Sequence, residues 1–121
     1  MIRNYRQRTG LALSALIVAG LVIISDRASA QANRCTEEAA SIRRAESQLP
    51  RLEIAPPDDQ QIVCITLETN ILFARRMAAH LMQCPRSPHA RSADAWQRTG
   101  SQYTAQFGNR GCKPAIRGYR G

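Results

Sequence analysis

Residues 58–84 read DDQQIVCITLETNILFARRMAAHLMQC, and this stretch decides the fold. Apolar residues recur in it at steps of three and four positions, the period of one face of an α-helix: Cys64, Leu67, Ile71, Ala74, Ala78 and Leu81. Further apolar residues widen this face, as expected of a central helix contacted from two sides: Ile62, Ile65, Leu72, Phe73 and Met77. Asp58 opens the stretch and Gln61 follows three residues later, in the arrangement of a capping box. The pattern predicts a helix over residues 58–83.

Shorter helical patterns lie on both sides of this central helix. Upstream, Thr36 is a suitable N-cap for a helix that Pro50 ends. Downstream, Ser92 is a suitable N-cap for a third helix, in which Gly100 is a weak point because glycine costs about 1 kcal/mol relative to alanine. The sequence therefore predicts an all-α fold, a small antiparallel bundle of about three helices, over residues 36–49, 58–83 and 92–107.

The four cysteines, Cys35, Cys64, Cys84 and Cys112, predict two disulfides that staple this bundle. In an up-down-up bundle, the start of the first helix lies beside the end of the second, which favours a Cys35–Cys84 bond. The same packing favours Cys64–Cys112. A Cys64–Cys84 bond is disfavoured because about 30 Å of helix separates the two, and a disulfide needs α-carbons within about 7 Å. The pairing of Cys35 with Cys64 and of Cys84 with Cys112 remains open.

Residues 1–30 have the pattern of a cleavable secretory signal peptide. Arginines precede an apolar run over residues 11–24, and Ala28-Ser29-Ala30 supplies the small residues of a cleavage site. A helix of that length spans about 21 Å, whereas a membrane core is about 30 Å thick, so a cleaved signal is favoured over a transmembrane anchor. We predict a signal peptide over 1–30, a helical domain over 31–112, a basic flexible tail over 113–121, and export to the periplasm or the cell exterior.

Positive charge is concentrated in the last third of the chain. Residues 31–84 have a net charge of −1, whereas residues 85–121 have a net charge of +6 and only one acid, Asp94. These residues are candidates for contact with an acidic protein or an anionic envelope surface: Arg91, Arg98, Arg110, Lys113, Arg117 and Arg120. A solvated tail that only aids solubility is the alternative explanation. Nucleic acid is not expected as a partner, because no aromatic residues interleave with the basic ones to stack on bases.

No motif for catalysis, metal binding or a cofactor stands out. His80, Cys84 and His89 have the spacing H-x3-C-x4-H, but a fourth zinc ligand is not evident, so His80 is interpreted as a helix-surface residue and His89 as a loop residue. Five acids are explained as first-turn or solvent-facing residues: Glu37, Glu38, Glu46, Asp58 and Asp59. No serine has a nucleophile-elbow context. The stripe of Trp96, Tyr103 and Phe107 is interpreted as core rather than as a docking groove. We therefore expect no catalytic residue, no metal and no cofactor.

These observations favour an exported small helical protein that acts as a non-enzymatic binding or accessory protein of the cell envelope through its basic C-terminal surface. A small secreted enzyme without a recognisable motif is one alternative, and a periplasmic stress chaperone is another. The oligomeric state is not predicted.

Overall fold

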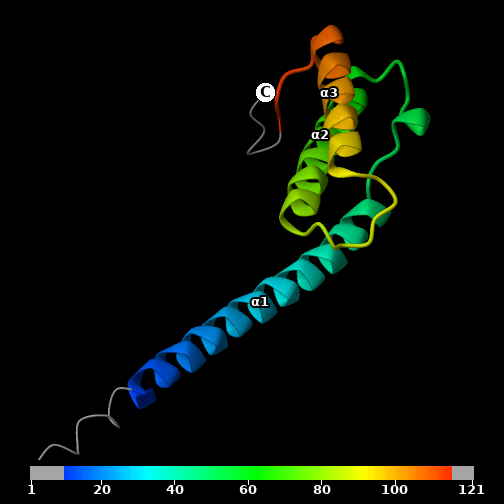
Figure 1. The fold of residues 1–121 in the computed structure, drawn as a ribbon. Helices are drawn as coiled ribbons and strands as arrows, with labels where there is room; N and C mark the ends of the chain where they lie inside the picture. Colours follow the sequence, from blue (N-terminus) through cyan, green and yellow to red (C-terminus); the bar gives the residue numbers. More distant parts are fainter. Residues whose placement is uncertain (1–9, 116–121) are drawn as a thin grey trace, which may run out of the picture. The chain divides into compact units, whose positions relative to one another are not determined.

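The structure is a computed structural model that describes the backbone of residues 10–115 and the side chains of residues 26–115. Its elements are three α-helices and one turn of 3-10 helix (Figure 1): α1 (Gly10–Ser47), η1 (Leu52–Ile54), α2 (Gln60–Gln83) and α3 (Ala93–Asn109). No strand occurs in the described part of the chain. The predicted all-α fold is confirmed. The chain divides into two compact units, Met1–Arg34 and Cys35–Gly121, and the second contains the helical bundle.

Helix α1 ends where the sequence predicts and begins well before. Its last residue is Ser47, and Pro50 follows after a final turn. Its first residue is Gly10, so Thr36 lies inside the helix rather than at its N-cap. The predicted start was wrong because residues 21–35 contain neither proline nor glycine to interrupt the helix. Over the described residues, no helix combines the length and apolarity needed to cross a membrane.

Helix α2 is the centre of the bundle, as predicted, and its N-cap is one residue later than expected. The carboxylate of Asp59, not that of Asp58, accepts a hydrogen bond from the backbone N–H of Ile62 at 3.0 Å. Asn70, buried on α2, donates its side-chain amide to the backbone oxygen of Pro50 at 2.9 Å. This bond ties the linker between α1 and α2 to the surface of α2.

Helix α3 begins at the predicted cap and packs along α2 (Figure 1). The Ser92 hydroxyl accepts a hydrogen bond from the backbone N–H of Ala95 at 3.2 Å. The helix continues through Gly100 without a break. Gly100 is buried, and a Cβ atom added there would lie 3.4 Å from the Cβ of Ala74. The missing side chain therefore lets the two helices approach closely at this point.

The end of α3 is a Schellman motif that places Cys112. The N–H of Cys112 donates to the oxygen of Phe107 at 3.1 Å, and the N–H of Gly111 donates to the oxygen of Gly108 at 3.0 Å. Gly111 has a φ of 69°, which is unfavourable for a residue with a Cβ atom. The helix was predicted to end at residue 107, but it continues to Asn109, so Gly108 lies inside its last turn.

Alanine substitutions at these two glycines are expected to have opposite effects. Gly111→Ala is expected to lower the free energy of unfolding by about 1 kcal/mol, because alanine is strained at a positive φ. Gly108→Ala is expected to raise it by about 0.5–1 kcal/mol, because Gly108 is helical and its Cβ would contact nothing within 4 Å. Urea unfolding of the two variants measures both effects. The same sign of change in both would contradict the motif.

The core consists of two clusters along α2. The first contains Ile42, Phe73, Ala74, Met77, Ala78 and Trp96, and the second contains Val63, Leu67, Ile71 and Phe107. Trp96 and Phe107 are core residues, as predicted, and Tyr103 packs at the edge of the second cluster. Ile62 and Ile65 were expected to widen the buried face, but each is 42% exposed. That expectation was wrong because both side chains lie at the margin of the buried face of α2, where they remain partly in contact with solvent.

Both predicted disulfides are present. Cys35 is bonded to Cys84, with α-carbons 5.8 Å apart, and Cys64 is bonded to Cys112, with α-carbons 5.5 Å apart. The first bond joins α1 to the end of α2. The second joins α2 to the segment after α3. The antiparallel geometry inferred from the sequence therefore gave the correct connectivity.

Candidate functional site

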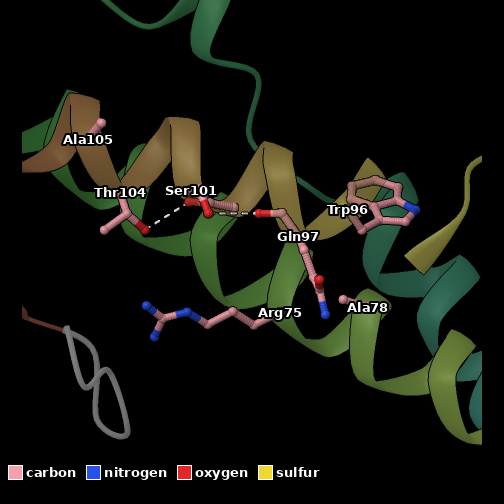
Figure 2. Close-up of a pocket in the computed structure, with 8 residues that line it drawn as sticks. Arg75, Ala78, Trp96, Gln97, Ser101, Thr104 and Ala105 are labelled. Carbon is pink, nitrogen blue, oxygen red and sulfur yellow. Dashed lines mark hydrogen bonds between the residues drawn. The ribbon is translucent and has the colours of Figure 1, made fainter. Parts of the chain in front are cut away.

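A groove with a volume of about 650 Å³ lies between α2 and α3 (Figure 2). Two of its lining residues are on α2 and the others on α3: Arg75, Ala78, Trp96, Gln97, Gly100, Ser101, Thr104 and Ala105. Figure 2 shows the Arg75 side chain extended below α3 toward the Thr104 end of the groove, with Trp96 at the opposite end. The groove is therefore elongated and follows the two helices.

The side chains in the groove present a small, mostly apolar surface. The hydroxyl of Ser101 donates to the backbone oxygen of Gln97 at 3.0 Å, and that of Thr104 donates to the oxygen of Gly100 at 2.8 Å (Figure 2). Both hydroxyl protons are therefore satisfied within α3. At the rim, Met82 is 66% exposed, and its sulfur accepts a weak hydrogen bond from Gln97 at 3.6 Å. Exposed methionine adapts to apolar side chains of different shapes.

At one end of the groove, Trp96 is surrounded by aromatic and charged side chains. Phe73 and His89 both meet the indole edge-on, with ring centroids at 5.5 Å and 5.6 Å. The guanidinium of Arg91 lies 4.3 Å from the ring centroid, within the range of a cation–π interaction. Arg91 also donates to the hydroxyl of Thr99 and so is fastened to the first turns of α3. These contacts give Arg91 a structural role in covering Trp96.

The structure does not gather the six predicted partner-binding residues into one patch. Arg91 precedes α3, and the exposed Arg98 lies on α3 beside the groove residue Gln97. Arg110 is the C-cap of α3, and the exposed Lys113 follows it. A helix of 17 residues is about 25 Å long, so Arg91 and Arg110 lie at opposite ends. The two remaining residues, Arg117 and Arg120, lie outside the described part of the chain.

The first and last parts of the mature sequence differ in net charge, but this difference does not produce two oppositely charged sides of the bundle. The side chain of Gln60 donates to the backbone oxygen of Arg110. This bond brings the acidic start of α2, Asp58 and Asp59, to the basic end of α3. Carboxylates therefore partly offset the positive charge at that pole.

Glu68 fastens the start of the C-terminal tail to α2. Its side chain is 1% exposed, and both carboxylate oxygens lie 3.1 Å from the backbone nitrogen of Ala115. The N–H of Ala115 donates to this carboxylate. Of the tail predicted to be flexible, the structure describes residues 113–115, and Ala115 is held in place by this contact.

Arg75 was not identified from the sequence as a candidate site residue, although its side chain lines the groove. It lies between Ala74 and Ala78, on the edge of the apolar seam that faces α3. A residue beside a seam is a candidate rim residue, so the signal was in the helical period. The groove itself could not be predicted from the sequence, because the width of the groove depends on how closely α2 and α3 approach each other at Gly100.

His80 was interpreted as a surface residue, and this was wrong. It is 2% exposed, since the loop after α2 and the last turns of α1 cover its ring. Its Nε2 atom lies 2.9 Å from the hydroxyl of Ser87, and its Nδ1 atom lies 3.2 Å from a carboxylate oxygen of Glu38. The sulfur of Cys84 is bonded to Cys35. Among the described residues, no group of three or more His, Cys, Asp or Glu side chains is arranged to hold a metal ion.

Comparison of the chain with protein-family models, curated proteins and solved structures found no match.

Proposed function

We propose that this chain is an exported binding protein of the periplasm or the cell exterior, which holds an acidic, amphipathic segment of a partner protein in the groove between α2 and α3. We further propose that residues 1–30 are removed as a signal peptide during export. Two disulfides are typical of an oxidising, exported environment, and they support this placement. Removal of residues 1–30 lowers the net charge from +8 to +5, so the mature chain remains basic.

The observation that carries the proposal is the combination of a small, mostly apolar groove with an arginine among its lining residues. Ala78, Gly100 and Ala105 leave space for the apolar side chains of a partner helix or strand. Arg75 lines the groove, and Arg98 is exposed elsewhere on α3. None of the described lining residues is acidic. A partner with apolar residues on one face and carboxylates along its edges complements this surface.

Basic residues outside the groove add attraction at longer range. Arg110 and Lys113 are exposed near the end of α3, and they raise the positive potential that an acidic partner meets on approach. Such charges act mainly on the association rate and are screened by salt, with a Debye length of about 8 Å at physiological ionic strength. The contacts inside the groove would set the affinity.

The groove can be tested with a defined probe, a synthetic helical peptide with leucines on one face and glutamates along its edges. The peptide is expected to shift the amide NMR signals of the groove residues on α2 and α3. Ala105→Glu is expected to weaken its binding about tenfold, because the new carboxylate narrows the groove and repels the peptide; tenfold corresponds to about 1.4 kcal/mol. Titration by NMR or calorimetry gives both affinities.

Gln102→Glu is the matched control, because it adds the same charge at an exposed position of α3 outside the groove lining. It is expected to change the affinity less than about twofold, since a single exposed charge contributes little. Equal weakening by the two variants would show that only net charge matters. Signal changes confined to residues outside the groove would also contradict the proposal.

A further inference from the structure

We propose that Ser87, His80 and Glu38 form an acyl-transfer site, in which Ser87 is the nucleophile and His80 the general base. The hydroxyl of Ser87 lies 2.9 Å from Nε2 of His80, and the carboxylate of Glu38 lies 3.2 Å from Nδ1 on the other side of the same ring. A hydroxyl, an imidazole and a carboxylate in this order are the parts of a serine hydrolase relay. The three residues come from α1, α2 and the loop after α2, and none of them lines the groove.

The Cys35–Cys84 disulfide explains why these three side chains meet. Glu38 lies one turn after Cys35 on α1, and His80 lies one turn before Cys84 on α2. The bond between the cysteines therefore brings the two turns together. Ser87 is held next to them because its N–H donates to the oxygen of Cys84 at 2.9 Å. The nucleophile and the base are thus positioned by a covalent link and a short turn.

The two reacting side chains differ in their exposure to solvent. The proposed base, His80, is shielded from water, whereas the proposed nucleophile, Ser87, is partly accessible. The ring of His80 is 2% exposed, Ser87 is half-buried, and the Glu38 side chain is 39% exposed. The Nδ1 atom of His80 and the Glu38 carboxylate are at contact distance, but their directions are not those of a formed hydrogen bond. Catalytic hydrogen bonds are often long or poorly aligned before substrate binds, and they tighten in the complex.

Further titratable groups lie near this trio. Arg76, one turn before His80, donates to the hydroxyl of Ser41, one turn after Glu38, at 2.9 Å. His89 is 3.9 Å from the carboxylate of Glu46, two turns beyond Glu38 on α1, and Arg86 is the exposed neighbour of Ser87. The Glu46–His89 contact holds the far side of the same loop against α1. Arg86 is placed to attract a negatively charged part of a substrate.

The reaction follows from the geometry. The Ser87 oxygen attacks the carbonyl carbon of an ester while its proton moves to Nε2 of His80, and Glu38 stabilises the imidazolium that forms. The C–O bond to the alcohol breaks, and His80 returns the proton to the leaving oxygen. Water then attacks the acyl–serine ester in the same way, with His80 again taking and returning a proton. The products are a carboxylic acid and an alcohol, and the enzyme is regenerated.

The turn around Ser87 limits the substrate class to esters with a good leaving group. The N–H of Ser87 is already bonded to Cys84, and its neighbour Pro88 has no N–H to offer a developing oxyanion. One oxyanion donor is worth about 10²–10³ in kcat, so amides are out of reach of this site. General base catalysis contributes about 10²–10⁴, which is enough for measurable turnover of an activated aryl ester.

The test uses the full-length, oxidised protein and p-nitrophenyl acetate. Ser87 is expected to become acetylated, which peptide mapping by mass spectrometry detects, with a matching release of p-nitrophenolate. Ser87→Ala is expected to abolish acetylation at this position and the release above background. Ser47→Ala, which removes another hydroxyl that donates to a backbone oxygen within the protein, is expected to change nothing.

Replacement of the other two residues separates catalysis from a structural role. His80→Gln is expected to lower the acylation rate about 100-fold, since the base is lost. Glu38→Gln, at a partly exposed position that tolerates the change, is expected to lower kcat about tenfold with KM unchanged, because Glu38 acts only through His80. Acylation of Ser87 that proceeds equally fast in Glu38→Gln would overturn the relay. Absence of Ser87 acetylation in the native protein would overturn the site and assign the trio to anchoring the loop, whatever the outcome at the groove.

Discussion

Replacing Cys64 and Cys112 together by alanine is expected to lower the free energy of unfolding by about 4 kcal/mol. The bond joins residues 48 positions apart, and in the chain-entropy model a loop of that size restricts the unfolded chain by about this amount. Both cysteines also pack against the second core cluster. Small domains are stable by only about 5–15 kcal/mol, so the loss is a large share of the total. Urea unfolding of the oxidised protein and of the variant measures it.

The other disulfide offers a matched comparison. Cys35 and Cys84 are 49 positions apart, so their replacement by alanine is expected to produce nearly the same loss of stability. The local consequences differ. Loss of Cys64–Cys112 is expected to increase amide exchange at the end of α3, and loss of Cys35–Cys84 at the end of α1 and in the loop after α2. A loss below about 1 kcal/mol in both variants would contradict the view that this bundle depends on its disulfides.

Leu67→Ala is expected to lower the free energy of unfolding by about 3 kcal/mol, within the range of about 2–5 kcal/mol for buried leucine. Leu67 is 0% exposed at the centre of the second core cluster, where α2 meets α3. Closely packed helices cannot collapse into the space that the smaller side chain leaves. Denaturant unfolding gives the value, with the slope of the transition as a check that the unfolded state is unchanged.

Ile54→Ala is the control for this prediction. Ile54 also carries an aliphatic side chain of four carbons, but it is 75% exposed at the end of η1. Its replacement is expected to change stability by less than about 0.5 kcal/mol. A comparable loss at both positions would mean that Leu67 is not part of the core.

Local rules were enough to predict most of the fold. The apolar seam of α2 and the Ser92 cap of α3 depend on neighbours within one turn, which the sequence displays directly. The observed disulfide pairing was favoured because antiparallel helices bring defined ends together, and the structure excludes the pairing of Cys35 with Cys64 that the sequence left open.

Features that depend on contacts between distant segments were not predictable. His80 follows Phe73 and Met77 at helical spacing on α2, and this signal in the sequence was missed. The return of α1 and the loop after α2 completes its burial. Its meeting with Glu38 and Ser87 therefore escaped sequence reasoning. Arg98 and Arg110 were predicted to belong to one basic surface. In the structure they are separated along the length of α3.

We expect the chain to be exported into an oxidising compartment and to fold there into a bundle with one specific pair of disulfides. The most direct test is mass spectrometry of the protein isolated from the cells that make it, with thiols blocked at lysis and peptides mapped without reduction. We expect a mature chain that begins at Gln31, with Cys35 linked to Cys84 and Cys64 linked to Cys112. A chain that retains residues 1–30 with free thiols, or a peptide that links Cys35 to Cys64, would contradict it.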